Sequence, residues 1–182
     1  MNTRDLSYIA LSVALISISA WIALPIGDIP ITMQTAVICL VAGLLGFKRA
    51  AFALFAYILL GAIGAPVFAG FTGGVVKLVA PTGGYIIGFL WIAITVGVVS
   101  DLTKKNPKRR WVYLAFAMSL GLIFCYAFGT GWFVFLAMQN GEIVEIWTVL
   151  SICVLPYIPF EIIKIALAVF MTEKMKKITK AI

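Results

Sequence analysis

The sequence predicts an all-α integral membrane protein with six transmembrane helices and both termini in the cytoplasm, and two observations support this fold class. The first is composition: of 182 residues, 63% are apolar and only 12% are charged, with a mean hydropathy of +1.12. Ordinary soluble domains carry roughly 25% charged residues. Six apolar stretches approach the ~20 residues that cross a ~30 Å hydrocarbon layer. Little chain is left over, so we expect residues 1–182 to form a single transmembrane domain.

The second observation is the distribution of positive charge. Of the 14 Lys and Arg residues, all except Lys77 and Lys164 lie in polar breaks that alternate with breaks holding Asp28, Glu142 and Glu145. The basic breaks hold Arg4, Lys48, Arg49, Lys104, Lys105, Lys108, Arg109, Arg110, Lys174, Lys176, Lys177 and Lys180. By the positive-inside rule these breaks and both termini are cytoplasmic. We expect the charges to contact membrane lipid headgroups rather than nucleic acid.

Three predicted helices precede residue 64. The first covers about residues 5–24, an apolar run after Arg4 that is longer than the core of a usual signal peptide, so we expect it to be retained. The next two, at 33–47 and 50–64, are short and separated only by Lys48 and Arg49. This spacing predicts a tight helical hairpin on the cytoplasmic side.

Three more predicted helices follow, at 84–102, 111–137 and 146–175. The last contains Pro156 and Pro159. Because proline lacks an amide N–H and bends or breaks a helix, we expect the first part of this helix to form a separate segment.

Missing residue types exclude several functions. The chain has no His, which excludes His-dependent hydrolysis, His-ligated metal sites and His proton relays. Cys39, Cys125 and Cys153 are isolated in apolar segments and lack metal-ligand or redox spacing. No phosphate-binding GxxxxGK[ST] loop is present. We therefore expect no enzyme activity, no metal and no cofactor, and any energy from ATP would come from a partner.

Glu161 and Lys164 are the most informative polar residues. On insertion scales each costs about 2.5–3.5 kcal/mol near the centre of a bilayer. Lying three residues apart, they project from the same face of a helix. Two interpretations stay open: a structural ion pair that neutralises itself, or a pair that offers an acceptor and a donor to one polar ligand. The prolines just before the pair favour a helix that opens beside a cavity.

Two segments on the outer side supply further candidate contacts. The first, residues 24–35, is stiffened by two prolines and ends in Thr32, Gln34 and Thr35. Either threonine could instead cap the following helix, because Thr is a favourable N-cap residue. Gln34 is the residue that capping explains least.

The second segment, residues 64–85, is rich in glycine, which lets the backbone approach a ligand closely. Free backbone amides at the start of the next helix would favour a carboxylate or a polar carbonyl. Thr82, Gly83 and Tyr85 are therefore candidate contacts. Gly84 belongs to a GxxxG step, so close helix packing is an alternative role for the glycines.

Small residues form a narrow stripe on the first helix. Ser7, Ala10, Ala14 and Ser17 recur at spacings of three and four residues. Such stripes let helices approach closely within a membrane. The neighbour could be another helix of this chain or a helix of a partner protein.

Five motifs combine across nearly the whole chain. They are AxxxA (Ala10, Ala14), PxTxQT (Pro30 to Thr35), GxPVF (Gly64 to Phe68), PTGGY (Pro81 to Tyr85) and an acid-xx-Lys pair (Glu161, Lys164). The combination resembles the BioY family; PxTxQT with PTGGY is specific, whereas AxxxA alone is not. The family pattern has Asp where this chain has Glu161, a change that keeps the charge but lengthens the arm.

The resemblance implies a biotin-specific S component of an energy-coupling factor (ECF) transporter in a bacterial plasma membrane. Such a chain captures biotin from outside, while a separate transmembrane coupling protein and two cytoplasmic ATPases drive release inward. The face with Ala10 and Ala14 would dock the coupling protein. The implied biotin contacts are Thr32, Gln34, Thr35, Phe68, Thr82, Gly83, Tyr85, Glu161 and Lys164.

The chemistry of biotin agrees with this set. Its ureido ring presents two N–H donors and a carbonyl, which Glu161 and Lys164 could meet, and its apolar parts suit Phe68 and Tyr85. The valerate carboxylate could instead bind Lys164, so the pose stays open. Alternatives are an S component for another vitamin, a passive facilitator for small solutes, or a membrane enzyme, although a facilitator would need polar groups along the whole bundle.

Overall fold

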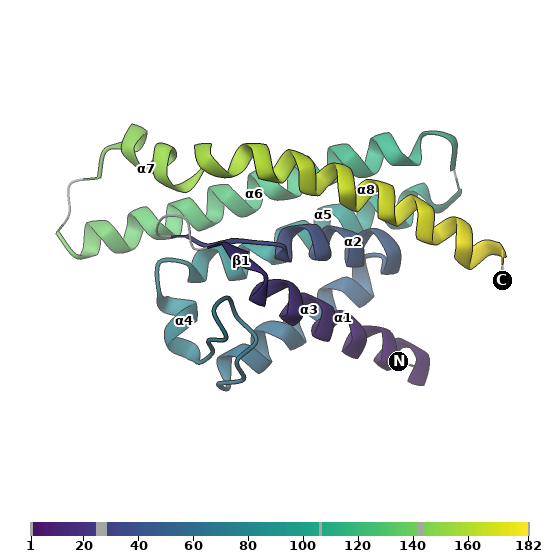
Figure 1. Ribbon diagram of the computed structural model, residues 1–182, viewed down its shortest axis with the longest axis horizontal. Helices are drawn as coiled ribbons and strands as arrows, with labels where there is room; N and C mark the ends of the chain where they lie inside the picture. Colours follow the sequence, from purple (N-terminus) through teal and green to yellow (C-terminus); the bar gives the residue numbers. More distant parts are fainter. Residues whose placement is uncertain (1, 25–28, 106, 142–143, 182) are drawn as a thin grey trace.

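Helices make up most of the chain in a computed structural model that describes residues 2–24, 29–105, 107–141 and 144–181 (Figure 1). The helices are α1 (Thr3–Trp21), α2 (Gln34–Leu45), α3 (Phe47–Ala62), α4 (Val75–Val79), α5 (Gly83–Leu102), α6 (Arg110–Gln139), α7 (Ile146–Cys153) and α8 (Ile158–Ala181). The strands β1 (Ala23–Leu24) and β2 (Ile31–Thr32) pair antiparallel. The helices predicted at 5–24, 33–47, 50–64, 84–102 and 111–137 are confirmed within a few residues.

The predicted helix at 146–175 is divided in two. α7 ends at Cys153, a short 3-10 turn covers Leu155–Tyr157, and α8 begins at Ile158. Pro156 lies in the turn and Pro159 in the first turn of α8, where a missing amide N–H costs least. The separate segment that the prolines predicted is therefore confirmed.

The two connections at 24–35 and 64–85, which were predicted to face the outside, contain elements that the sequence analysis missed. The 24–35 segment was expected to be a loop, but its two sides form the β1–β2 pair, with Ala23 opposite Thr32 and Leu24 opposite Ile31. The 64–85 segment contains α4. Strands of two residues and a helix of five are too short to produce a periodic pattern. Pro25 and Asp28 lie outside the described residues.

In the predicted hairpin a single residue, Gly46, connects α2 and α3, whereas Lys48 and Arg49, which were expected to separate the two helices, lie in the first turn of α3. Gly46 has φ +80°, a left-handed conformation that glycine adopts without strain. The amide of Phe47, the first residue of α3, donates to Asp101 Oδ2 of α5 at 2.9 Å. This carboxylate satisfies one of the backbone donors left free at a helix start, and it anchors the hairpin to α5.

Glycines bring α5 and α6 close together. A side chain on Gly84 would collide with Trp132, one on Gly88 would press on Cys125, and one on Gly121 would meet Thr95. The packing role considered for Gly84 is thus confirmed. The core between α2, α3, α5 and α6 contains side chains that are almost wholly buried, among them Leu54, Ile92, Leu114 and Met118.

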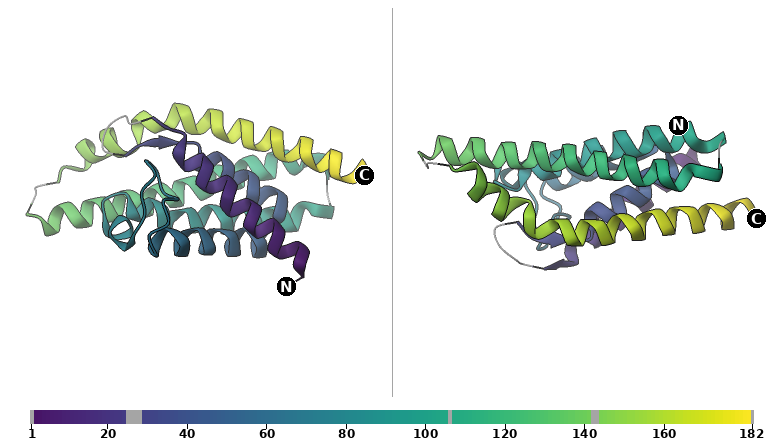
Figure 2. Two further views of the ribbon diagram at one scale, coloured as in Figure 1. Left: turned by 60° about the horizontal axis from the view of Figure 1, so that its bottom comes forward. Right: turned by 90° about the horizontal axis from the view of Figure 1, so that it is seen from above.

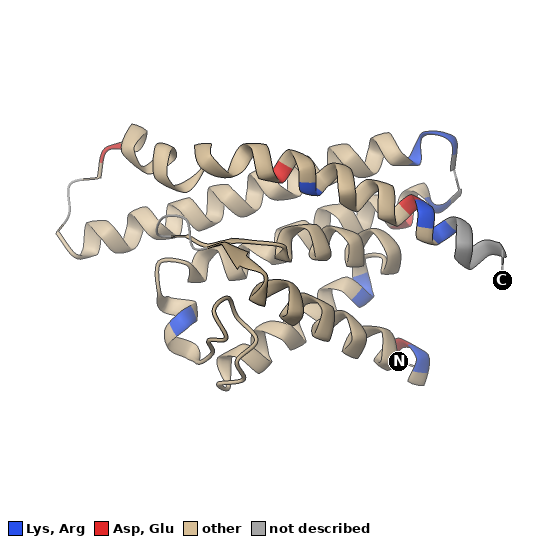
Figure 3. Cartoon of the chain, in the orientation of Figure 1, with Lys and Arg blue, Asp and Glu red and all other residues tan. Residues whose placement is uncertain are grey.

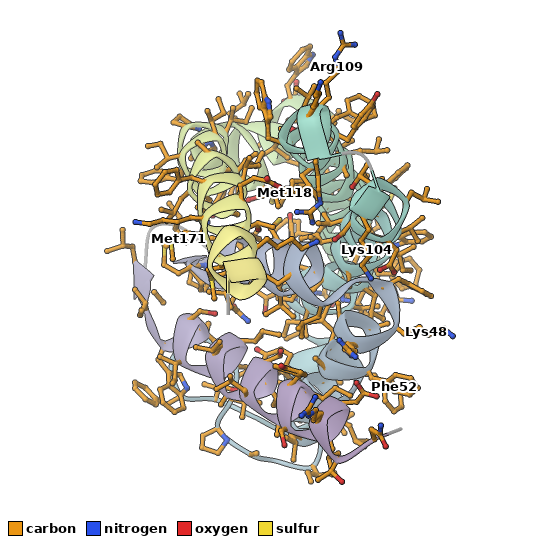
Figure 4. All side chains as sticks on the ribbon, turned by 90° about the vertical axis from the view of Figure 1, so that its right-hand side faces the viewer. Lys48, Phe52, Lys104, Arg109, Met118 and Met171 are labelled. Atoms are coloured by element: carbon orange, nitrogen blue, oxygen red, sulfur yellow. The ribbon has the colours of Figure 1, made fainter. Side chains whose placement is uncertain are left out.

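Basic residues gather at the end of the bundle where α1 begins and α8 ends (Figure 3). Viewed along the helices from this end, Lys48, Lys104 and Arg109 project from the periphery, whereas Met118 lies between the helices (Figure 4). α4 and the loop before it lie toward the opposite end (Figures 1 and 2).

Arg110 does not follow this pattern. It was expected among the charges at the lipid headgroups, but only 4% of its surface is exposed. Its guanidinium donates to Glu173 Oε1 at 2.9 Å, to the carbonyl of Gly43 at 2.9 Å and to Ser100 Oγ at 3.0 Å. These partners lie on α8, α2 and α5, so Arg110 connects four helices because its planar donors suit several acceptors at once.

Three helical segments of the described chain are long and apolar enough to cross a membrane. They are Gly83–Leu102, Arg110–Gln139 and Ile146–Lys176, and Gln34–Leu45 is a shorter apolar helix. At 1.5 Å per residue, α2 and α3 are about 18 and 24 Å long. The chain is therefore a mostly helical membrane protein with three clear apolar spans.

The stripe on α1 points outward in part. α1 packs against α2 and α3 through a face that includes Ile9, Val13 and Ile16. Ala10 and Ala14 lie on the exposed side, so no helix among the described residues covers them. Ser17 is buried and donates to the carbonyl of Val13 at 2.8 Å, which removes it from the exposed stripe.

Candidate ligand-binding site

A polar cavity of about 240 Å³ lies among α2, α3, α5, α6, α8 and the connections at 24–35 and 64–85. The polar residues that line it are Thr32, Gln34, Thr35, Tyr57, Thr72, Lys77, Thr82, Tyr85, Tyr126, Tyr157, Glu161 and Lys164. Donors and acceptors that converge on one hollow are the usual mark of a small-molecule site. Of the residues predicted to bind a ligand, all except Gly83 line this cavity.

A larger hollow of about 610 Å³ lies between α6, α7 and α8. Its walls are almost entirely apolar, with residues such as Leu122, Val134 and Ile162. A polar ligand would find few partners there, so we assign the smaller cavity as the candidate site. The two hollows share Tyr126 and Glu161 as lining residues.

The polar centre of the cavity is an ion pair on α8. Lys164 Nζ lies 2.8 Å from Glu161 Oε1, and both residues are buried, with 6% and 7% of their surface exposed. Thr35, in the first turn of α2, donates to Glu161 Oε2 at 2.9 Å and accepts from Lys164 at 3.2 Å. Tyr126 on α6 donates to Glu161 Oε1 at 3.2 Å. Pairing and hydrogen bonding offset the desolvation cost of two buried charges.

Gln34 is held by a second network. Its Nε2 donates to the hydroxyl of Tyr57 at 2.7 Å, and that hydroxyl donates to the carbonyl of Val67 at 3.1 Å. The Thr32 hydroxyl donates to Gln34 Oε1 at 3.0 Å. Phe68 packs edge-on against Tyr57, with ring centroids 5.5 Å apart. Tyr57 therefore joins α2, α3 and the 64–74 loop at the cavity wall.

The alternative role of the threonines as helix caps finds little support. The residue that precedes α2 is Met33, and no side chain caps the helix there. Thr35 uses its hydroxyl for Glu161 and Lys164 instead. Thr32 accepts from the amide of Gln34 at 3.4 Å, which is a long contact.

Two of the three candidate residues of the PTGGY segment, Thr82 and Tyr85, lie at the cavity. Tyr85 is buried, its hydroxyl is 2.9 Å from Thr130 Oγ1, and its ring packs edge-on against Tyr126 at 5.8 Å. Thr82 also lines the cavity. Gly83 does not, because its α-carbon faces the backbone of Leu78. Gly83 is therefore not among the lining residues, and its contact with a ligand stays a prediction.

Three of the backbone amides that were predicted to be free at the start of α5 already donate hydrogen bonds within the protein. The amide of Gly83 donates to the carbonyl of Ala80 at 2.8 Å, and those of Tyr85 and Ile86 donate to Thr82 at 3.1 and 3.3 Å. These donors are used within the turn, so they offer no anion site to a ligand.

The sequence analysis missed three tyrosines, Tyr57, Tyr126 and Tyr157, which all line the cavity. Each lies within an apolar stretch. The Tyr57 hydroxyl accepts from Gln34 and donates to the carbonyl of Val67. The Tyr126 hydroxyl donates to Glu161, and the Tyr157 hydroxyl donates to the carbonyl of Ile29. A buried tyrosine hydroxyl usually requires a partner, so tyrosines within apolar spans were the available signal.

Comparison with known proteins identifies the family of this chain. A family model described as the BioY family matches residues 1–181. The chain belongs to the BioY family. Two similar proteins are the biotin transporter BioY of Thermotoga maritima, 37% identical over 96% of this chain and 97% of that protein, and the probable biotin transporter BioY of Pyrococcus horikoshii, 34% identical over 97% and 98%.

A solved structure is similar over the same length. The 2.1 Å crystal structure of the S-component for biotin from an ECF-type ABC transporter has a TM-score of 0.80 and 28% sequence identity. The match covers 97% of this chain and 95% of that one. The resemblance carried by the sequence motifs is therefore confirmed, and this BioY-family chain has the S-component fold.

Proposed function

We propose that this protein is the biotin-binding S component of an ECF-type ABC transporter. It is a multi-pass membrane protein and a transporter subunit, not an enzyme. The observation that carries the proposal is the buried Glu161–Lys164–Thr35 cluster at a cavity with aromatic walls, in a chain whose relatives are named biotin transporters.

The cavity suits the size and chemistry of biotin. At about 240 Å³ it lies near the lower limit of ligand pockets, roughly 300 Å³, which favours a small vitamin. Glu161 can accept from the ureido N–H groups and Lys164 can donate to the ureido carbonyl. Phe68 and Tyr85 provide apolar surface for the fused rings and the aliphatic arm.

The topology proposed for this function has six spans, with both termini in the cytoplasm. The clustering of Lys and Arg at the end where α1 begins and α8 ends supports it (Figure 3). In this orientation α4 and the outer connections face the outside. In the proposed topology α1, α2, α3, α5 and α6 are spans, and α7 with α8 forms the sixth.

The proposed partners are a transmembrane coupling protein and two ATPase subunits. The chain has no phosphate-binding GxxxxGK[ST] loop, so any energy from ATP would come from another polypeptide. The exposed positions of Ala10 and Ala14 on α1 support a docking face there, because small residues let a partner helix approach closely.

Purified protein alone should bind biotin saturably and with high affinity, without ATP or divalent metal, because the capture groups all lie in this polypeptide. Titration followed by tryptophan fluorescence or calorimetry measures this binding. Riboflavin and thiamine serve as matched vitamin controls. Tight binding of either one, with no saturable binding of biotin by folded protein, would overturn the substrate assignment.

The passive-facilitator alternative is tested by reconstitution. Liposomes that contain this chain alone should not equilibrate biotin across the membrane, because the polar groups gather around one cavity rather than along the bundle. Rapid flux without partners or ATP would favour the facilitator instead.

A further inference from the structure

Lys77 is the charged residue of the cavity that the proposed function has not used. It lies on α4 (Val75–Val79), away from the basic end of the bundle (Figure 3). Together with Glu161 and Lys164 it is one of three charged residues that line the cavity. Its side chain is half-buried, whereas Glu161 and Lys164 are buried. Lys77 therefore lies nearer the cavity mouth.

The two lysines of the cavity differ in their partners. Lys164 already has Glu161 at 2.8 Å and Thr35 at 3.2 Å. The ion pairs found in the described part of the chain involve Arg49, Lys104, Arg110 and Lys164. Lys77 forms none of them. The deep charges thus balance each other, and among the residues that the structure describes Lys77 adds one positive charge without an ion-pair partner toward the mouth.

This charge pattern matches a ligand with a neutral polar head and an anionic tail. Half-burial strengthens the attraction of an ammonium for an anion, because less water screens the pair. The inner cluster offers one acceptor and one donor group without net charge, which suits a neutral ureido ring. Lys77 and the inner pair also lie on different elements, α4 and α8, so they can contact different parts of one ligand.

We propose that Lys77 binds the valerate carboxylate of biotin while Glu161 and Lys164 contact the ureido ring. The proposal rests on the proposed function and fixes the pose that the sequence left open. It assigns Lys77 as a determinant of specificity for the acid over its neutral derivatives, since a charge-assisted hydrogen bond to the carboxylate has no equivalent in an ester.

The test compares biotin with biotin methyl ester on the wild type and on Lys77→Met, which keeps most of the length of the side chain but removes its charge. Wild-type protein should bind biotin more tightly than the ester. Lys77→Met should weaken biotin binding about ten-fold or more and leave the affinity for the ester unchanged. Lys77→Arg should retain most of the preference for biotin.

The control variant is Lys164→Met. It should weaken biotin and the ester by similar factors, because both ligands carry the same ureido ring. The proposal is rejected if Lys77→Met affects both ligands equally or neither, or if Lys164→Met is the variant that removes the preference for the acid. Failure of the wild type to bind biotin would instead overturn the proposed function, so the two failures are distinguishable.

Discussion

Replacing either Glu161 or Lys164 by alanine should weaken biotin binding about ten-fold or more and should also lower the thermal stability of the ligand-free protein. A hydrogen bond to a charged group contributes about 1.5–3 kcal/mol, and about 1.4 kcal/mol is a factor of ten in affinity. The stability loss follows from burial, because removing one partner of a buried ion pair leaves an uncompensated charge, at a cost of about 3–5 kcal/mol. Calorimetric titration and thermal unfolding in detergent measure the two effects.

A double variant separates ligand contact from structural pairing. Glu161→Gln with Lys164→Met removes both charges, so it should recover much of the stability lost in the single variants. Biotin affinity should not recover, because the charged acceptor and donor are gone. Wild-type affinity in the double variant would show that the pair is structural only.

Glu173→Ala is the matched control on the same helix. Glu173 of α8 forms an ion pair with Arg110 at 2.9 Å, and it does not line the cavity. Removing the Glu173 carboxylate should lower the thermal stability, because the buried guanidinium of Arg110 loses its ion-pair partner. Biotin affinity should stay close to that of the wild type. Equal losses of affinity in Glu173→Ala and Glu161→Ala would indicate a general effect on α8 packing.

The sequence predicted the features that depend on which residue types follow one another along the chain: the helix positions, the break in the last helix and the charged pair within it. Helix positions follow from apolar length and from charged breaks. The break at Pro156 in the last helix was predicted because proline lacks an amide N–H. Glu161 and Lys164 stood out because a charged group within an apolar span carries a cost that function or pairing must offset. These signals are local, so no knowledge of packing was needed.

What the sequence could not predict depends on how helices rotate against one another. Thr35 meets Glu161 across a separation of 126 residues, and no local pattern encodes that contact. Gly83 and Tyr85 are close neighbours in one motif, yet only Tyr85 faces the cavity. Arg110 follows two exposed basic residues but turns into the bundle. Tertiary packing decides each of these orientations.

Tryptophan at both Ala10 and Ala14 should abolish biotin uptake in cells while leaving biotin binding to the isolated chain intact. Both alanines are exposed on α1, so the indoles would face outward and would not overpack the core. They would hold apart any partner helix that approaches the small-residue stripe. Uptake, biotin affinity, thermal stability and co-purification with the coupling module should be measured on the same variant.

The control places two tryptophans on a helix that does not pack against α1. Phe116→Trp with Ile123→Trp changes two side chains of α6 that are 69% and 63% exposed, and this variant should retain uptake and co-purification. The proposed topology puts both pairs in contact with lipid, so the membrane environment is matched. Loss of coupling in the α1 variant alone would support docking at Ala10 and Ala14. Retained co-purification together with lost biotin binding would reject docking at Ala10 and Ala14, because the substitutions would then have disrupted the binding site of this chain and not its contact with a partner.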